Sequence, residues 1–272
     1  MQRITRIRKA GPWHDAGALL AWAALILAAI AQIVGGIVPL VLGLVLFAAG
    51  LSHGAGDEQS GLLKRFGLVQ AAAYLVVGAA VAGLFLAEPL AGLALFLALS
   101  AWHFARSDCA MGPLARGAIA ALATGGSALF RPRATSAVFE AVIAHSVPGI
   151  FMDLVALAGI VGCVLVVVSL VRNERGCGEA LIALAATALL YPVLAVGLIF
   201  LVGHAIPIQR RQIAAYGQRT VWKAVALPTL IAFVGGVALA VLTATGRLEL
   251  ELAAALAFGL ATPHMLTERL ER

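Results

Sequence analysis

Four histidines stand out because each lies at or near the C-terminal end of a long apolar run. They are His53, His103, His204 and His264. An ionisable side chain is costly to place at membrane depth, so such residues usually pair with one another, line a cavity or bind a ligand. Imidazole-rich groups without thiolates suit iron, zinc, copper or nickel. The first hypothesis is therefore a metal site built from these four side chains.

The segment after His53 carries a carboxylate one helical turn further along the chain. If the helix continues, Asp57 can accept the second ring N–H of His53 and orient the other ring nitrogen toward a metal. Gly54 and Gly56 also allow the helix to end here, in which case His53 caps a helix carbonyl. Both interpretations stay open at this point.

His103 is exceptional because it follows an uninterrupted uncharged run after Glu88. Arg106 can extend to the lipid headgroups, whereas a histidine one turn deeper is harder to hydrate. This favours a ligand role for His103 over a hydrogen-bonded core histidine. Trp102 and Phe104, which flank it, are expected to pack or to lie at the lipid interface rather than to contact a substrate.

Prolines accompany the other two histidines. Pro207 removes the N–H that would bond to the carbonyl of Gly203, and Pro263 directly precedes His264. A proline inside a helix removes one backbone hydrogen bond and disfavours helical geometry in the residue before it. We therefore expect a loosened turn beside each of these imidazoles.

The composition indicates the environment in which these histidines lie. The chain has 272 residues, of which 62% are hydrophobic and only 12% charged, with a mean hydropathy of +1.01. Soluble domains carry about 25% charged residues. The apolar runs approach or exceed the roughly 20 residues that cross a bilayer and do not alternate as barrel strands do. The sequence predicts an all-α polytopic transmembrane helical bundle of about 8 to 10 spans.

Apolar runs between charge clusters predict the individual spans. They are 16–34, 36–52, 66–87, 89–106, 115–130, 154–171, 179–203, 222–245 and 250–266. The segment 134–151, with Glu140, His145 and Pro148, is a further span, a re-entrant piece or an interfacial helix. We expect His145 not to be a ligand. Residues 1–15 are expected to form a basic cytoplasmic leader, and residues 16–272 a single transmembrane domain.

The basic residues indicate the orientation of the chain. The formal net charge is +6, and the Lys and Arg side chains cluster in short segments beside apolar runs, where they set topology rather than bind nucleic acid. The cluster from Arg3 to Lys9 predicts a cytoplasmic N-terminus with an uncleaved first span, and the loop 209–223 is also predicted to be cytoplasmic. If the spans that end in histidines all run inward, the four imidazoles share one depth near the cytoplasmic face.

Other chemistries find little support in the sequence. The cysteines Cys109, Cys163 and Cys177 are too widely spaced for a disulfide framework or a Cys-x-x-Cys metal site. The chain has no nucleophile elbow, P-loop or dinucleotide fingerprint. Two other classes stay open beside a metal enzyme: a transporter or proton conductor with a histidine-lined path, and a haem-binding redox subunit. A site buried in the membrane favours an apolar substrate that enters from the lipid.

The order and spacing of the histidine motifs resemble those of the Brp/Blh family, the membrane-bound bacterial and archaeal beta-carotene 15,15'-dioxygenases. The resemblance covers roughly residues 35 to 270. Four ordered motifs carry it: H-G-x-x-D from His53, H-F-x-x-x-D from His103, a histidine before a basic segment at His204, and P-H-M from Pro263.

The resemblance implies a non-haem Fe(2+) enzyme of the cell membrane that cleaves the central double bond of beta-carotene with O₂. The product would be two molecules of retinal, the chromophore of microbial rhodopsins. Its partners would be a carotenoid from the bilayer, O₂ and membrane lipid. The implied iron ligands are His53, His103 and His204, with His264 as a candidate fourth, and Asp57 and Asp108 would orient imidazoles through their second ring nitrogens.

One departure from the family pattern affects the expected site. Family members place a second histidine four residues after the one that matches His204, in a pattern like W-H-x-x-R-H. Here that position is Ile208, and Gly203 stands where the pattern has Trp. Loss of even an outer partner of a metal ligand typically costs about 10- to 100-fold in metal affinity or activity. A family member with altered specificity or without cleavage activity is therefore the alternative.

Overall fold

The computed structural model describes residues 16–51, 68–107 and 111–270. Regular structure in these ranges is helical throughout, and no strand occurs in them. The predicted all-α polytopic bundle is thus confirmed. Of the candidate site residues named above, His53, Asp57 and Asp108 lie outside the described residues.

The helices follow the apolar runs of the sequence closely. Their bounds are α1 (Ala16–Val34), α2 (Val38–Gly50), α4 (Leu68–Ala87), α5 (Pro89–Ser107), α6 (Pro113–Ala121), α7 (Ser127–Phe130), α8 (Pro132–Ile143), α9 (Gly149–Val171), α10 (Cys177–Leu189), α11 (Pro192–Phe200), α12 (Ile206–Tyr216), α13 (Gln218–Ala244) and α14 (Leu250–Leu270). Two π-helical turns interrupt them, η1 (Leu122–Gly126) between α6 and α7, and η2 (Leu201–Ala205) between α11 and α12.

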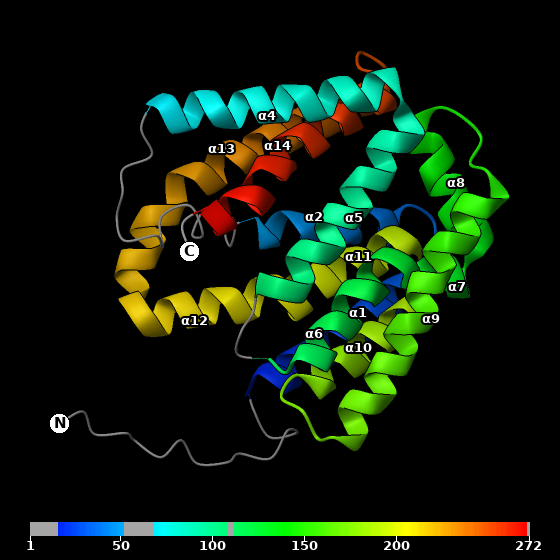
Figure 1. The fold of residues 1–272 in the computed structure, drawn as a ribbon, viewed down its shortest axis with the longest axis vertical. Helices are drawn as coiled ribbons and strands as arrows, with labels where there is room; N and C mark the ends of the chain where they lie inside the picture. Colours follow the sequence, from blue (N-terminus) through cyan, green and yellow to red (C-terminus); the bar gives the residue numbers. More distant parts are fainter. Residues whose placement is uncertain (1–15, 52–67, 108–110, 271–272) are drawn as a thin grey trace.

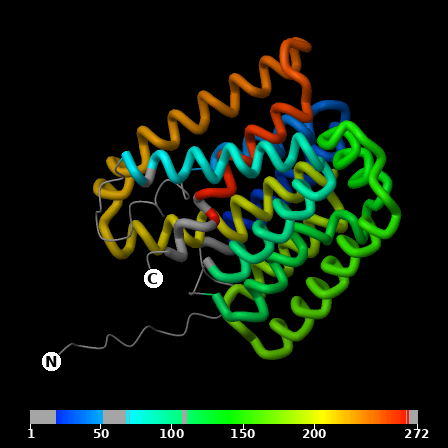
Figure 2. Tube along the Cα trace, turned by 45° about the horizontal axis from the view of Figure 1, so that its top comes forward, coloured from blue at the N-terminus to red at the C-terminus, as the bar shows by residue number. Residues whose placement is uncertain are grey.

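Two groups of helices pack together (Figures 1 and 2). On one side α4 packs along α14, with α13 beside α14; on the other side α1, α6, α9, α10 and α11 form a bundle. The larger buried cluster lies in this bundle and includes Leu122, Leu194 and Leu198. A smaller cluster around Phe85 and Ala255 joins α4, α5, α8 and α14. Helix α5 contacts both groups and so connects the two clusters.

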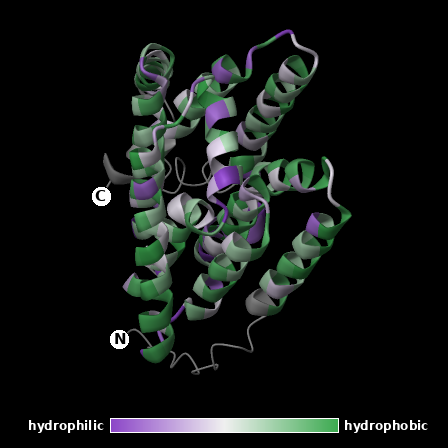
Figure 3. Ribbon diagram, turned by 90° about the vertical axis from the view of Figure 1, so that its right-hand side faces the viewer, coloured by the Kyte–Doolittle hydropathy of each residue, from purple (hydrophilic) through white to green (hydrophobic). Residues whose placement is uncertain are grey.

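The outer surface of the described helices is strongly apolar. Four helical stretches are long and apolar enough to cross a membrane: Pro89–Arg106, Gly149–Val171, Pro192–Tyr216 and Gln218–Ala244. On α13, Leu227, Ile231 and Val234 are 66%, 64% and 57% exposed. Figure 3 shows that hydrophobic residues make up most of the length of the helices in that view. Soluble monomers rarely expose continuous rows of large apolar side chains, so this surface is suited to contact with lipid.

The predicted single span 179–203 is wrong, because two helices occupy this stretch. Helix α10 ends at Leu189 and α11 begins at Pro192. Proline is favoured in the first turn of a helix and pushes the residue before it out of helical geometry. Tyr191 accordingly has extended angles (φ −59°, ψ 143°), and its N–H donates to Oε1 of Gln32 at 2.7 Å.

The predicted loop 209–223 is also mostly helical. Helices α12 and α13 meet at Gly217, whose φ of 82° lies in the region that glycine adopts without steric cost. Residues Pro192–Tyr216 form one helical stretch of 25 residues. His204 therefore lies inside a helical stretch. The expectation from the sequence that His204 closes a span was wrong.

The uncertain segment 134–151 is not a single helix. Helix α8 ends at Ile143, Ala144 has a left-handed φ of 56°, and α9 begins at Gly149. Nδ1 of His145 lies 2.8 Å from the carbonyl oxygen of Ile143. His145 thus serves the C-terminal end of α8, where a ring N–H satisfies an otherwise open carbonyl.

Candidate metal centre

The structure brings together two of the four predicted histidines. Nε2 of His103, from the last part of α5, lies 3.0 Å from Nε2 of His204, from η2. The side chains are 2% and 1% exposed, and their rings meet edge to face with centroids 4.8 Å apart. At this distance one ring donates its Nε2–H to the Nε2 lone pair of the other. Either histidine can be the donor, depending on which of the two neutral tautomers each ring adopts.

A π turn carries His204. The N–H of Ile206 donates to the carbonyl of Leu201, five residues back, where an α-helix would bond four residues back. Pro207 follows directly and has no N–H to donate. The loosened turn predicted beside His204 is therefore confirmed. Pro263 lies inside α14, which continues as α-helix on both sides of it without a π turn.

Aromatic rings enclose the histidine pair on one side. The ring of Phe104 lies 4.4 Å from that of His204 between centroids, and Phe200 lies 6.0 Å from it. Phe47 of α2 stacks on Phe200 at 4.4 Å. Phe104 thus packs, as expected from the sequence. Sequence reasoning missed Phe47 and Phe200, although Phe200 stands one helical turn before His204 and could have been found by that spacing.

Helix α2 is held close to α11 by glycines. A Cβ on Gly43 would lie 2.8 Å from the carbonyl oxygen of Val193, and one on Gly197 would collide with the carbonyl of Gly43. Further along, a Cβ on Gly50 would collide with the ring of Phe200. The contact positions advance in the same direction along the two helices, from Gly43 to Gly50 in α2 and from Val193 to Phe200 in α11. Helices α2 and α11 therefore run parallel.

The side chains of two predicted ligands, His53 and His264, are not described by the structure. His53 lies outside the described residues, but the chain is described up to Leu51, and the last turn of α2 packs beside the ring of Phe200, four residues before His204. The backbone of His264 belongs to α14, which packs along α4 through Gly78 and Gly259.

Within the described part of the chain, no group of three or more His, Cys, Asp or Glu side chains is arranged to hold a metal ion. The histidine pair supplies two donors that fit one. Two nitrogens bound to one ion at about 2.1 Å and at right angles to each other lie about 3.0 Å apart. This matches the 3.0 Å between the two Nε2 atoms. Imidazole nitrogen is also a suitable donor for iron. His103 and His204 thus fit as neighbouring ligands of one ion.

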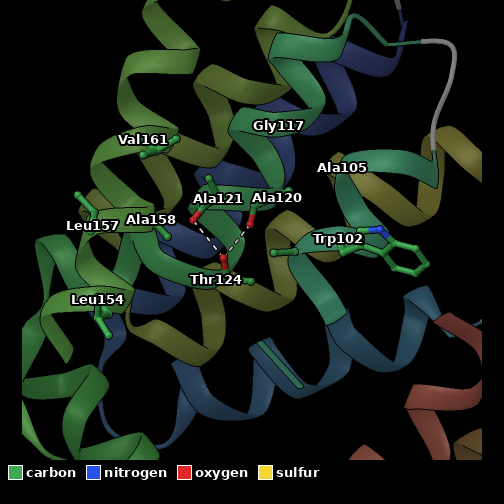
Figure 4. Close-up of a pocket in the computed structure, with 11 residues that line it drawn as sticks. Trp102, Ala105, Gly117, Ala120, Ala121, Thr124, Leu154, Leu157, Ala158 and Val161 are labelled. Atoms are coloured by element: carbon green, nitrogen blue, oxygen red, sulfur yellow. Dashed lines mark hydrogen bonds between the residues drawn. The ribbon is translucent and has the colours of Figure 1, made fainter. Parts of the chain in front are cut away.

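An apolar groove of about 560 Å³ lies on another face of α5 (Figure 4). Ala101 and Ala105 line it from α5, opposite Leu157 of α9. The hydroxyl of Thr124, also in its wall, donates to the carbonyl of Ala120 at 3.0 Å. Residues two positions from His103 point about 200° away from it around an α-helix. Helix α5 therefore separates this groove from the histidine pair.

The fold and the site define an all-α polytopic protein with a buried pair of imidazoles contributed by two helices. A family model described as Beta-carotene 15,15'-dioxygenase matches residues 44–270, a stretch that includes all four histidine motifs. The chain belongs to this family, a family of carotenoid-cleaving dioxygenases, as the motif order predicted. No curated protein and no solved structure matches the chain.

Proposed function

We propose that the protein is a membrane-embedded non-haem iron oxygenase that cleaves a carotenoid with O₂, converting beta-carotene to retinal. The observation that carries this proposal is the buried approach of His103 and His204, with Nε2 atoms 3.0 Å apart. Family membership supplies the reaction class. The four apolar helical stretches support a membrane location, which an apolar substrate requires.

In this proposal His53, His103 and His204 bind Fe(2+), and His264 is the candidate fourth ligand. The parallel packing of α2 and α11 supports the role of His53, because the described end of α2 lies next to Phe200, one turn before His204. Asp57 and Asp108 are proposed to accept the second ring N–H of a ligand histidine, which fixes its tautomer and orientation.

The bound iron would supply the activation of O₂ and the bond cleavage, whereas the chain supplies binding and orientation. Binding one ion requires the Nε2 lone pairs of both His103 and His204. The ring that donates its Nε2 proton to the other must then carry that proton on Nδ1 instead. Phe104 and Phe200 cover the pair with apolar surface and limit the access of water to these nitrogens.

Ile208 affects how complete this centre is. Its side chain is 2% exposed and stands one turn after His204, where the family pattern has a second histidine. An aliphatic side chain offers no lone pair, so the proposed centre has three ligands or is completed by His264. Altered carotenoid specificity or weak activity is the alternative outcome for this family member.

The proposed location is the cell membrane, with many spans and a cytoplasmic N-terminus set by the basic cluster from Arg3 to Lys9. The carotenoid would enter from the bilayer, and the retinal produced could serve a rhodopsin. Membership of the beta-carotene 15,15'-dioxygenase family and the apolar outer surface support entry of a carotenoid from the bilayer.

Expression in carotene-producing cells tests the proposal. We expect the pigment to bleach and retinal to accumulate, and the His103→Ala variant to leave the pigment intact at equal expression. Unbleached pigment without retinal, despite stable membrane insertion of the wild-type protein, would reject carotenoid cleavage.

A further inference from the structure

We propose that the π turn η2, kept open by Pro207, sets the position of His204 against His103. Pro207 is then a positioning residue of the metal centre, acting through the backbone without touching the metal. The inference rests on the proposed function, because that centre is the one described above. It adds a local structural cause for the approach of two imidazoles that stand 101 residues apart in the sequence.

The hydrogen bonding of η2 supports a role for Pro207. The N–H of Ile206 bonds to the carbonyl of Leu201, so this turn holds one residue more than an α-helical turn. Where a π turn returns to α-helical hydrogen bonding, the pairing of backbone N–H and C=O groups shifts by one residue. One backbone group then loses its regular partner. A proline next to that point has no N–H to leave unpaired.

A proline alone does not produce such a turn in this chain. Pro228 lies inside α13 and Pro263 inside α14, and both helices continue as α-helix. At η2 a second element contributes, because Ile119 of α6 packs against Gly203. A Cβ on Gly203 would lie only 3.0 Å from Cγ2 of Ile119. The turn is therefore held by a proline within the helix and by a close contact across it.

The position of this turn matters for the pair. Gly203 and His204 are neighbours, and the imidazole of His204 packs against both His103 and the ring of Phe104. Functional groups in such centres must be held to within about 0.5 Å of their working geometry. Closing the extra residue of η2 into an α-helical turn would rotate the imidazole about the helix axis and separate the two Nε2 atoms.

The test is the Pro207→Ala variant, which restores an N–H that can bond to the carbonyl of Gly203 and close the turn. Binding of Co²⁺ to purified protein is followed by its visible absorption. We expect the affinity to fall by about 10- to 100-fold, as for loss of a group that orients a ligand. The matched control is Pro228→Ala, which also replaces a proline within a helix, but in α13, and it should bind Co²⁺ as the wild type does.

A second readout needs no metal. In metal-free protein labelled with ¹⁵N-histidine, the bonded ring nitrogens of His103 and His204 should give signals distinct from those of a free imidazole. We expect Pro207→Ala to abolish this signature and Pro228→Ala to retain it. Gly203→Ala should shift these signals, because the new methyl group lies 3.0 Å from Cγ2 of Ile119 and one of the two must move by a few tenths of an ångström. The double variant Gly203→Ala/Ile119→Ala should restore them.

The two proposals fail in different ways. A wild-type protein that binds no Co²⁺ and no Fe²⁺ would count against the metal centre, while the ¹⁵N signals would still decide whether Pro207 positions the pair. Wild-type Co²⁺ affinity and wild-type ¹⁵N signals in Pro207→Ala would overturn the role of the π turn. If Pro207→Ala does not fold, Pro207→Ser, which also restores an N–H at this position, decides the same question. Wild-type Co²⁺ affinity and wild-type ¹⁵N signals in Pro207→Ser would then overturn the role of Pro207.

Discussion

The imidazoles of His103 and His204 stand 101 residues apart in the sequence, and their Nε2 atoms lie 3.0 Å apart in the structure. One is in the last part of α5 and the other in the π turn between α11 and α12. Both are almost fully buried at 2% and 1% exposure. Two such imidazoles, side by side in an apolar interior, form the core of the proposed iron site.

Replacement of His204 by alanine should remove iron from the protein. One of two neighbouring ligands is lost, and the affinity should fall by at least about 10-fold. Iron per protein chain after purification measures this. His145→Ala is the control, since that ring is engaged with the carbonyl of Ile143 at the end of α8. Equal iron content in the wild type and His204→Ala would rule out His204 as a ligand.

Replacement of Ile208 by histidine should strengthen the centre. The side chain is buried at 2% exposure one turn after His204, so an imidazole there can add a donor. We expect metal affinity or retinal formation to rise by about 10- to 100-fold. Ile208→Leu is the control, because it changes shape without adding a lone pair. An equal gain from Ile208→Leu would mean that packing, and not a new ligand, causes the effect.

Replacement of Gly43 by alanine should destabilise the fold. The added methyl group would lie 2.8 Å from the backbone of Val193, so α2 and α11 must move apart. Overpacking of this kind costs about 1 to 3 kcal/mol. Gly83→Ala in α4 is the matched control, because nothing lies within 4 Å of its added Cβ. There the better helix propensity of alanine should raise stability by up to about 1 kcal/mol. Thermal unfolding in detergent measures both, and equal melting temperatures would contradict the close crossing of the helices.

Replacement of Glu174 by alanine should loosen the start of α6. Its Oε2 accepts hydrogen bonds from the N–H groups of Leu114 and Ala115 at 3.0 and 3.3 Å. These groups have no partner within the helix, and loss of such a cap costs about 0.5 to 2 kcal/mol. Unfolding in denaturant measures the change in the free energy of unfolding. The control is Asp153→Asn, because Asp153 is exposed. A variant as stable as the wild type would show that water replaces the carboxylate without cost.

Much of the helical organisation could be predicted, because long apolar runs interrupted by charged residues leave few alternatives in hydrocarbon. The predicted spans 16–34 and 89–106 agree closely with α1 and α5. The break at Tyr191 was missed because the residues on both sides are apolar. A proline in such a run either kinks a helix or starts a new one, and packing decides which. Pro192 starts a helix, whereas Pro228 and Pro263 lie inside one.

By itself the sequence determined that the chain is an apolar helical bundle with histidines at the ends of its runs, and motif order pointed to the right family. These properties are local, since they depend on residue types and short spacings. Only the tertiary structure decided that His103 meets His204, since their separation depends on how α5 packs against the stretch from α11 to α12. The sequence also predicted a loosened turn beside His204, but not that this turn is a π turn, nor that Ile119, from a distant segment, packs against Gly203 within it.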